Sequence, residues 1–233
     1  MELEIKNYAV LYLGGIEIWI TDTMVSTWII MGILIALSIV VRIKVRKFKE
    51  VPTGFQNAIE GLVEVFEGYL RSTVGDKLMF LGYWFFTLFI FILLSNLSGL
   101  FPGIRPPTAD WSFTFGMALV TFILIQAMGI KFRGTGYLKS FVEPYYMAFL
   151  FLPINIIGEL ARPISLSFRL FGNMLAGLIM MSLIYALFPV FAQFIIPSAL
   201  HAYFDLFSGA LQTYIFVTLS MTFIAGAAEV AES

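Results

Sequence analysis

The sequence S-L-S-F-R-L-F-G-N, residues 165–173, decides the fold class of this chain because it places one arginine, Arg169, in a long apolar run. No aspartate, glutamate, lysine or other arginine follows Arg169 until Asp205. A guanidinium stays protonated at any pH that a protein tolerates, and a charge inside a bilayer costs from about 3 to more than about 10 kcal/mol. Arg169 therefore requires a counter-charge, water or a functional role.

The composition of the whole chain is that of an integral membrane protein. Its 233 residues are 60% hydrophobic and 12% charged, with a mean hydropathy of +0.91, whereas soluble domains have about 25% charged residues. The formal net charge of −1 provides no field that would attract nucleic acid. Because the chain has no cysteine, a single histidine and no Walker-type phosphate loop, we expect no metal site, no cofactor and no nucleotide chemistry in it.

Five apolar segments are long enough to be transmembrane helices. They predict an all-α integral membrane protein with one membrane domain over residues 1–233, in which amphipathic surface helices accompany the spans. The last two spans are expected to form a long, tilted C-terminal hairpin. We expect the spans at residues 24–41, 78–101, 113–130, 154–188 and 198–228.

Three segments outside the spans have their own character. Residues 1–22 are acidic with a single lysine, which fits neither a signal peptide nor a transit peptide, so we expect a tail outside the membrane. Residues 53–72 place apolar side chains at helical spacing opposite glutamates, which is typical of an amphipathic surface helix. Residues 141–152 are apolar but too short to span before Pro153, so we expect a surface or re-entrant segment.

The distribution of basic residues predicts the orientation of the chain. Ten lysines and arginines flank the spans on one side, against Lys6 and Arg105 on the other. Because basic residues concentrate in cytoplasmic loops, the N-terminus is expected outside and the C-terminus in the cytoplasm. The ten are Arg42, Lys44, Arg46, Lys47, Lys49, Arg71, Lys77, Lys131, Arg133 and Lys139.

The C-terminal hairpin carries two polar stripes. Helices over 154–188 and 198–228 would be about 50 and 45 Å long, against a hydrocarbon core of about 30 Å, so both must tilt strongly. On a helical wheel, the polar residues of the first arm fall within roughly 80° and those of the second within roughly 60°. Such stripes face something other than lipid. They comprise Asn155, Glu159, Arg162, Arg169 and Asn173 on the first arm, and His201, Asp205, Ser208 and Gln212 on the second.

Several of these polar residues also have a structural interpretation. Asn96, near the outer end of its span, either bonds a neighbouring helix or lines an aqueous inlet. Arg162 can extend its head group to the interface and pair with Glu159 at i+3, which leaves Glu159 as either an ion-pair partner or an ion relay. His201 near the outer turn can be interfacial, and Arg169 can pair within its own chain as a buried bridge.

Four motifs resemble subunit a of the F-type ATP synthase, and the resemblance covers nearly the whole chain. They are P-I-S-L-S at 163–167, R-L-F-G-N-M-L-A-G at 169–177, G-A-L-Q-T-Y-I-F at 209–216 and S-N-L-S-G-L-F-P-G at 95–103. The resemblance implies a stator subunit against which a ring of c subunits turns, with Arg169 facing an acidic side chain on each passing c helix. It implies that Arg169 is the counter-ion of that carboxylate and a barrier to ion leak between two aqueous half-channels.

The same resemblance implies further roles along the polar stripes. Asn173, Asp205 and Gln212 match positions near the outer half-channel, and Gln212 is expected to hydrogen-bond Arg169 across the hairpin. Glu159 and Asn155 are candidates for ion relay on the first arm. Many members carry an acid or a histidine where this chain has Leu178, which leaves Asp205 as the one carboxylate of that relay.

The resemblance also implies the surroundings of the chain. Its expected partners are the c-subunit ring, the b subunits of the peripheral stalk and membrane lipid, in a bacterial plasma membrane. The expected role is an essential ion-channel subunit with H⁺ as the translocated ion; Na⁺ remains an alternative, because the ligands of the ion would lie on subunit c. A secondary transporter is the alternative class, but it would show an inverted repeat with matched broken helices, and we find none. A purely structural membrane subunit would not need two polar stripes.

Overall fold

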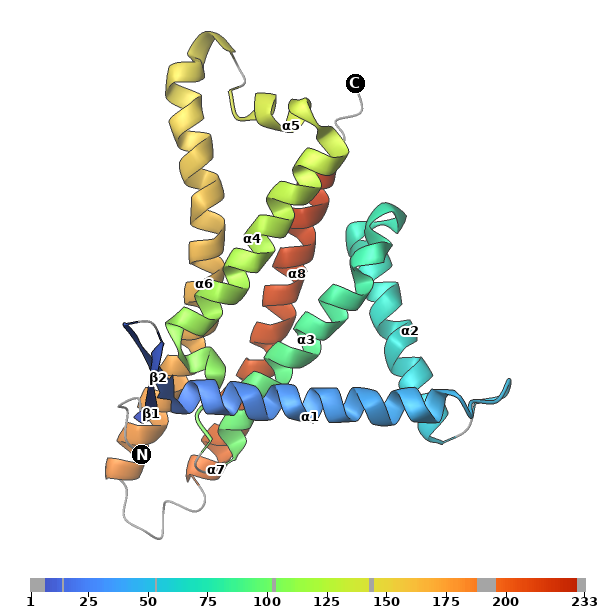
Figure 1. The fold of residues 1–233 in the computed structure, drawn as a ribbon, viewed down its shortest axis with the longest axis vertical. Coiled ribbons are helices and arrows are strands. Elements are labelled where there is room, and N and C mark those ends of the chain that lie inside the picture. Colours follow the sequence, from blue (N-terminus) through green and yellow to red (C-terminus); the bar gives the residue numbers. More distant parts are fainter. Residues whose placement is uncertain are drawn as a thin grey trace.

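The computed structural model describes residues 7–13, 15–52, 54–101, 104–142, 145–187 and 196–229, which form a group of long, mutually inclined helices with a β-hairpin at the edge (Figure 1). In this part of the chain, five segments are long and apolar enough to cross a membrane, which confirms the predicted all-α membrane fold. They are Asp22–Val45, Asp76–Leu100, Trp111–Arg133, Ala148–Leu187 and Ala202–Ala228.

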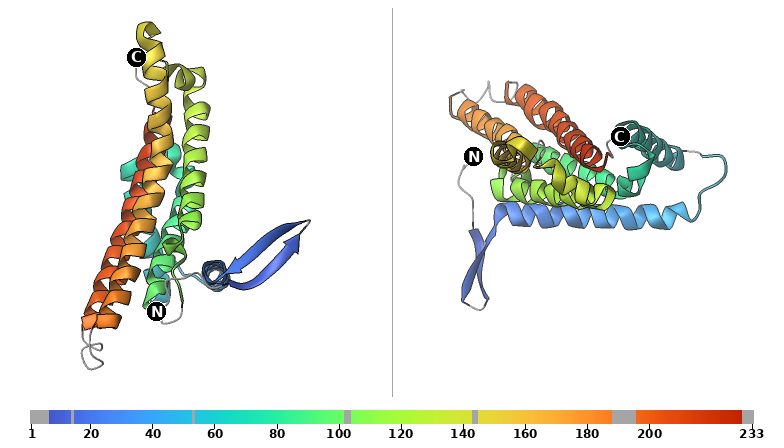
Figure 2. Two further views of the ribbon diagram at one scale, coloured as in Figure 1. Left: turned by 90° about the vertical axis from the view of Figure 1, so that its left-hand side faces the viewer. Right: turned by 90° about the horizontal axis from the view of Figure 1, so that it is seen from above.

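A two-stranded antiparallel hairpin precedes the first span, where the sequence predicts only a tail. Strand β1 (Asn7–Leu13) pairs with β2 (Ile16–Thr21), and Leu13 lies opposite Ile16 at the turn. Gly15 makes this turn possible because its φ is 89°, a conformation that other residues rarely adopt. The hairpin projects away from the helices (Figure 2). Residues 1–6 of the expected tail lie outside the described residues.

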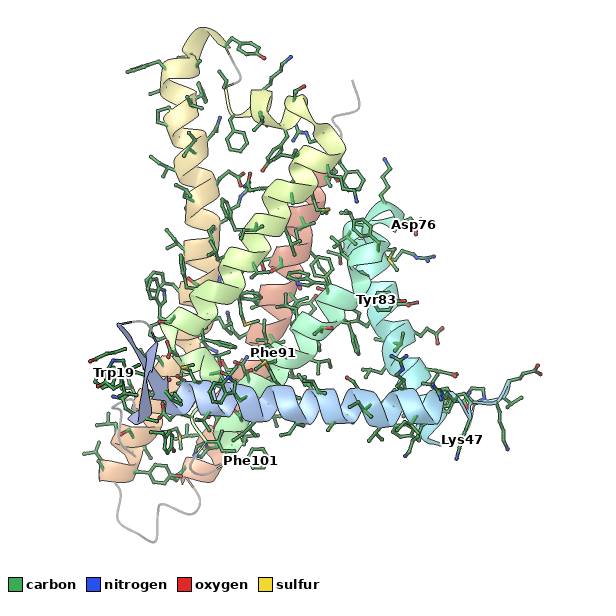
Figure 3. The ribbon with its side chains drawn as sticks, in the orientation of Figure 1. Trp19, Lys47, Asp76, Tyr83, Phe91 and Phe101 are labelled. Carbon is green, nitrogen blue, oxygen red and sulfur yellow. The ribbon has the colours of Figure 1, made fainter. Side chains whose placement is uncertain are left out.

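Helix α1 (Asp22–Val45) contacts the other helices mainly through its first turns. Thr21 caps it by accepting a hydrogen bond from the Met24 N–H at 3.3 Å, and the Thr23 hydroxyl donates to Asp110 Oδ2 at 2.9 Å. The remainder of α1 exposes large aliphatic side chains, as a lipid-facing helix does. The helix lies across the direction of the other long helices, and Trp19 and Lys47 mark its opposite ends (Figure 3).

Helix α2 (Phe55–Val74) is the amphipathic helix that the sequence predicts at residues 53–72. Its C-terminal half packs against the start of α3 (Gly82–Leu97), which follows a 3₁₀ segment at Asp76–Leu81. The approach is so close that a Cβ at Gly82 would lie 2.9 Å from Leu70 Cδ2. A short 3₁₀ turn, Ser98–Leu100, ends the second span.

Helix α8 (Gly209–Ala228) is at the centre of the helical body. It packs against α2, α3, α4 (Trp111–Arg133) and α6 (Ala148–Leu187), and it belongs to the most buried of the five spanning segments. Because lipid already solvates apolar side chains, close packing rather than the hydrophobic effect holds these helices together. The largest fully buried apolar side chains come from these elements: Leu70, Phe85, Ile92, Ile125, Leu170, Met181, Phe216, Val217, Met221 and Ile224.

Helix α6 has 40 residues and begins at Ala148 rather than at 154. Residues 148–152, expected to belong to a surface or re-entrant segment, are therefore its first turns; α5 (Thr135–Ser140) and a 3₁₀ turn at Tyr145–Met147 precede it. Pro153 and Pro163 lie inside the helix, where each removes one backbone hydrogen bond without ending it. At about 60 Å, α6 exceeds the bilayer core twofold and so requires strong tilt.

The second arm of the hairpin is not one regular helix, in contrast to the single helix expected at 198–228. It consists of α7 (Ile196–His201), a π-helical segment at Ala202–Ser208, and α8. A π-helix turns less per residue than an α-helix, so it changes the direction of every side chain that follows. The wheel of constant 100° steps therefore does not describe the positions of His201 to Gln212.

Candidate functional site

Arg169 lies on the exposed side of α6 and has no hydrogen-bond or ion-pair partner among the described residues. It lines a groove of about 220 Å³ between α6 and α8, together with Arg162, Leu219 and Phe223. The alternative of an intrachain bridge from Arg169 to Glu159 or Asp205 does not form, because each carboxylate pairs elsewhere. The guanidinium is thus available to a charge from outside the chain.

The hydrogen bond expected between Arg169 and Gln212 is absent in the described structure. The two residues lie at similar levels of the hairpin. Asn173 and Ser208 contact each other, Arg169 lies four residues before Asn173, and Gln212 lies four residues after Ser208. Helical side chains lean toward the preceding turn, and Arg169 accordingly lies along the groove toward Leu219. Gln212 is buried on α8, and its Nε2 has no hydrogen-bond partner.

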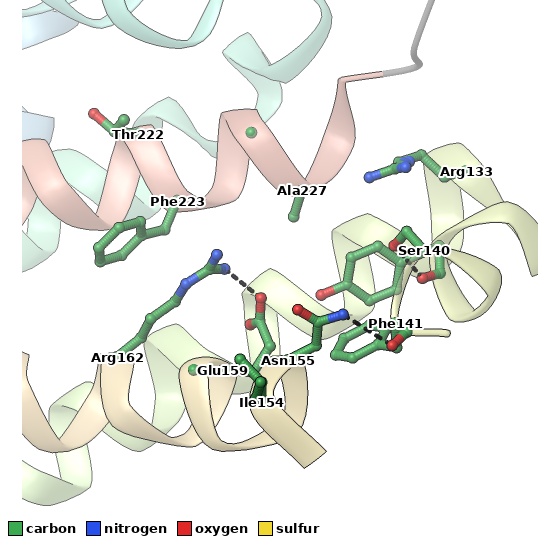
Figure 4. A pocket seen from close by; sticks show the side chains of 13 residues that line it. Arg133, Ser140, Phe141, Ile154, Asn155, Glu159, Arg162, Thr222, Phe223 and Ala227 are labelled. Atoms are coloured by element: carbon green, nitrogen blue, oxygen red, sulfur yellow. Dashed lines mark hydrogen bonds and ion pairs between the residues drawn. The ribbon is translucent and has the colours of Figure 1, made fainter. Parts of the chain in front are cut away.

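The inner polar cluster surrounds an ion pair on α6. Arg162 Nη1 lies 2.7 Å from Glu159 Oε1, and the guanidinium also lies over the Phe223 ring at 5.2 Å from its centroid. Figure 4 shows Arg162 and Glu159 pointing toward each other with Phe223 beside them. The expected pair of Arg162 with Glu159 at i+3 is therefore present, and the Arg162 side chain remains 37% exposed.

Two residues outside the polar stripes complete the inner cluster. Gln126 of α4 donates from Nε2 to Glu159 Oε2 at 3.2 Å, and the Tyr137 hydroxyl of α5 donates to Gln126 Oε1 at 3.0 Å. Burial raises the pKa of Tyr137 above 10, and the nearby Glu159 charge adds to the effect, so the hydroxyl stays protonated. The sequence signal for Gln126 was its polarity within an apolar span; nothing distinguished Tyr137 from other loop tyrosines.

A cavity of about 550 Å³ opens beside this cluster, and Asn155 lies in its wall. Asn155 Nδ2 donates to the Phe141 carbonyl at 2.9 Å, which ties α6 to the turn after α5. The cavity and the Arg169 groove share Gly158, Arg162 and Phe223. The two hollows are therefore neighbours along α6, with Arg162 and Phe223 in the wall of each.

The outer polar cluster is built on the π-helical segment. Asp205 is buried there, and its Oδ2 lies 2.5 Å from His201 Nδ1; the Tyr185 hydroxyl lies 3.3 Å from His201 Nε2. The Asp205 carboxylate approaches the 3₁₀ turn Ser98–Leu100 so closely that a Cβ at Gly99 would lie 3.3 Å from Oδ1. Since π-helical turns are rare and often occur at functional sites, the distorted turn marks Asp205 as the centre of this cluster.

Asn96 connects three segments behind the outer cluster. Its Nδ2 donates to the Gly209 carbonyl at 2.8 Å and to Thr213 Oγ1 at 3.0 Å, while its Oδ1 accepts from the Thr108 hydroxyl at 2.7 Å. The side chain is completely buried. Of the two interpretations of Asn96, the structure therefore forms the interhelical link.

A further hydrogen bond joins the two arms of the hairpin near the outer cluster. The Ser208 hydroxyl donates to Asn173 Oδ1 at 3.0 Å and fixes the π-helical segment against α6. The two clusters thus lie on opposite sides of Arg169 along α6, with Glu159 and Arg162 before it and Asn173 after it.

Fold and site together define a class of protein: a helical membrane protein whose long hairpin carries, between two polar clusters, an arginine without a partner among the described residues. A family model described as ATP synthase A chain matches residues 24–225. ATP synthase subunit a of Desulfosudis oleivorans is 38% identical over 211 residues, which cover 88% of this chain and 87% of that protein. ATP synthase subunit a of Moorella thermoacetica is 36% identical over 222 residues, which cover 95% and 96%.

A third relative bears on the coupling ion. The protein named ATP synthase subunit a, sodium ion specific, of Propionigenium modestum is 36% identical over 227 residues, which cover 89% of this chain and 74% of that protein. The family match extends over most of the chain, and the identities exceed what chance similarity gives. The chain therefore belongs to the ATP synthase A chain family, the subunit a of ATP synthases, which confirms the resemblance.

Proposed function

We propose that this chain is the ion-translocating stator subunit of an F-type ATP synthase and that Arg169 works against a carboxylate on a rotating ring of c subunits. The observation that supports this is the exposed guanidinium of Arg169, which has no partner among the described residues, whereas Arg162 is paired with Glu159 and Asp205 contacts His201. A charge kept unpaired in an apolar setting needs a partner, and since the described residues supply none, the proposal places it on a second subunit.

The chemistry of the step follows from the fixed charge. When a protonated or ion-loaded ring carboxylate comes close to Arg169, the guanidinium favours its ionised form and lowers its pKa, so the ion leaves. The free cation is repelled by Arg169 and cannot pass directly to the opposite side. Arg169 thus releases the ion from the ring and blocks a leak along the stator.

The two polar clusters are suited to be two half-channels. The cavity and groove from Asn155 and Glu159 toward Arg169 would connect the ring to the cytoplasm. The buried cluster of Asp205, His201, Asn173, Ser208 and Gln212 would connect it to the outside. Asn96 acts behind this path as an interhelical support.

The remaining parts of the proposal concern the surroundings. The c-ring would cover the exposed side of α6 around Arg169, and the b subunits of the peripheral stalk and lipid would cover other apolar faces such as that of α1. Basic residues after α1, which include Lys47, favour a cytoplasmic position for that end and an outside position for the N-terminus. The proposed membrane is a bacterial plasma membrane, in keeping with the likeness to subunit a of Desulfosudis oleivorans.

The coupling ion is proposed to be H⁺, with Na⁺ as the alternative that the sodium-specific relative from P. modestum favours. The test is ATP hydrolysis by the reconstituted complex with and without Na⁺ and a protonophore. Turnover that is independent of Na⁺ supports H⁺. Sodium-stimulated turnover accompanied by ion uptake that survives the protonophore contradicts it.

The stator role is tested by replacing Arg169 with alanine in the complete complex. We expect ATP-driven ion pumping in vesicles to fall by more than about tenfold while the complex still assembles, because the lost charge stabilises only the ionised ring carboxylate. Arg42→Ala removes an exposed arginine at the end of α1 and is the matched control. Retained pumping in Arg169→Ala would refute the role, and loss of assembly would instead indicate a structural arginine.

A further inference from the structure

Hydrogen bonds and an ion pair connect four side chains from three elements in a chain at the inner cluster. The Tyr137 hydroxyl of α5 donates to Gln126 of α4, Gln126 donates to Glu159 of α6, and Glu159 pairs with Arg162 one turn further along α6. Figure 4 shows the pair at the wall of the 550 Å³ cavity. The function proposed above gives Gln126 and Tyr137 no role.

The direction of the hydrogen bonds fixes the orientation of the Gln126 amide. Its Oε1 accepts from the Tyr137 hydroxyl at 3.0 Å, so its NH₂ group faces Glu159 Oε2 at 3.2 Å. Tyr137 is itself held, because its ring fills the space above Gly129, where a Cβ would come within 2.7 Å of it. A tyrosine hydroxyl can donate or accept, whereas a carboxylate only accepts, so it is Glu159 that keeps the NH₂ group of the amide turned toward it.

Both oxygens of Glu159 are consequently engaged. Oε1 lies 2.7 Å from Arg162 Nη1, and Oε2 accepts from Gln126. A side chain that relays ions must rotate or change its protonation state as each ion passes. The Glu159 carboxylate is instead held by Arg162 on one oxygen and by Gln126 on the other. The arrangement suits a fixed counter-ion better than a carrier.

The neighbouring arginines explain why a fixed counter-ion matters. Arg162 and Arg169 line the same groove, and seven residues of α-helix separate them by about 10 Å along the axis. Without Glu159, Arg162 would be a second uncompensated cation on the way from the inner cavity to Arg169. A positive charge in a narrow, low-dielectric path repels cations.

We infer that Gln126 and Tyr137 are positioning residues that hold Glu159 on Arg162, and that this neutral pair keeps the inner cavity permeable to the translocated cation. The inference rests on the stator function proposed above. It assigns Glu159 the role of a counter-ion rather than of a relay. Of the two arginines in the groove, Arg169 then remains the one without a carboxylate partner in the described residues.

A charge-removal pair tests the role of Glu159 in the complete complex, reconstituted in vesicles. Glu159→Gln leaves Arg162 unpaired and is expected to lower ATP-driven pumping about tenfold, as one uncompensated charge in a low-dielectric path would. The double change Glu159→Gln with Arg162→Gln removes both charges and should recover at least about half of the native rate. A relay predicts the opposite, because the double variant would remain as slow as Glu159→Gln.

The role of the positioning residues is tested in both backgrounds. Gln126→Leu and Tyr137→Phe should each lower pumping severalfold in the native chain but have no further effect in the double variant, since the pair on which they act is gone. Equal losses in both backgrounds, or no loss in the native one, would overturn the inference. Tyr145→Phe changes an exposed tyrosine just before α6 and is the matched control.

Two measurements separate the possible failures. Arg169→Ala is assayed in the same vesicles: if it still pumps, the stator function itself is wrong, and if it does not pump while the double variant stays slow, only the counter-ion role is wrong. The amount of this chain in the purified complex reports assembly. Tyr137→Phe removes a single oxygen, so it keeps the test valid where larger changes reduce assembly.

Discussion

Arg162 and Arg169 lie two helical turns apart on α6 and line one groove, but in the described part of the chain only Arg162 has a carboxylate partner. At a separation of about 10 Å and an effective dielectric constant of about 20, two bare charges would repel each other by about 1 to 2 kcal/mol. Glu159 cancels most of that repulsion at Arg162. No described carboxylate compensates the charge of Arg169 in the same way.

The buried amide of Asn96 gives the first prediction. Asn96→Leu should destabilise the subunit by about 1 to 3 kcal/mol, because the Thr108 hydroxyl is left buried without its acceptor. Thermal unfolding of the purified complex, followed by the loss of this chain from it, measures the effect. Asn57→Leu on the exposed side of α2 is the control. Equal stability of the two variants would contradict a structural role for Asn96.

The outer carboxylate gives the second prediction. Asp205→Asn preserves size but removes the charge that faces His201 Nδ1, and it should lower both ATP synthesis and ATP-driven pumping by about tenfold or more if Asp205 passes the ion. Asp76→Asn should change neither rate, since Asp76 and its partner Arg71 are largely exposed and such pairs contribute little. Normal pumping by Asp205→Asn would exclude this carboxylate from the ion path.

A pair of glycines on α4 gives the third prediction. A Cβ at Gly129 would come within 2.7 Å of the Tyr137 ring, whereas one at Gly116 would have no neighbour within 4 Å. Gly129→Ala should displace the ring, cost about 1 to 3 kcal/mol of stability and lower pumping through Gln126. Gly116→Ala should be neutral or slightly stabilising, because alanine favours the helix. The comparison is measured by thermal unfolding and pumping, and similar behaviour of both variants would refute the predicted steric effect.

The raised pKa of Tyr137 gives a prediction about pH. Its native pKa lies above the ordinary value of 10, mainly because burial disfavours the ionised form, so the folded chain holds this proton more tightly than the unfolded chain. The stability that the hydroxyl contributes is therefore complete below pH 10 and is lost as the pH rises through the native pKa. Unfolding of the native chain and of Tyr137→Phe should differ by a constant amount up to about pH 10 and converge above it. A difference that already shrinks near neutral pH would contradict this assignment.

The sequence pattern predicted part of the polar site on the C-terminal helical hairpin. Its polar residues were identified from the sequence, since isolated polar groups in long apolar runs are conspicuous. Their partners were not, because Gln126 and Tyr137 come from elements that the wheel of a single helix does not include. The expected bond from Gln212 to Arg169 is absent because a side chain's lean along its helix, and not only its level, decides what it reaches.

The sequence did not predict the N-terminal β-hairpin or the π-helical segment of the second arm, for a similar reason. Strand pairing of Asn7–Leu13 with Ile16–Thr21 depends on contacts between two segments. The π-helical segment at Ala202–Ser208 contacts α6 through the Ser208–Asn173 hydrogen bond, a contact between residues distant in the sequence. Neither the strand pairing nor the π-helical segment follows from the composition of a short stretch of sequence.

The sequence by itself determined that the chain is a helical membrane protein with five spans and that Arg169 is its exceptional charge. These properties follow from the free energy of transferring each segment from water into the bilayer, which is a sum over the residues of that segment. Only the tertiary structure decided that Gln126 of α4 bonds Glu159 and that Asp205 turns inward beside Gly99. Partners of that kind are chosen by the packing of helices distant in the sequence, because a hydrogen bond requires contact within about 3 Å.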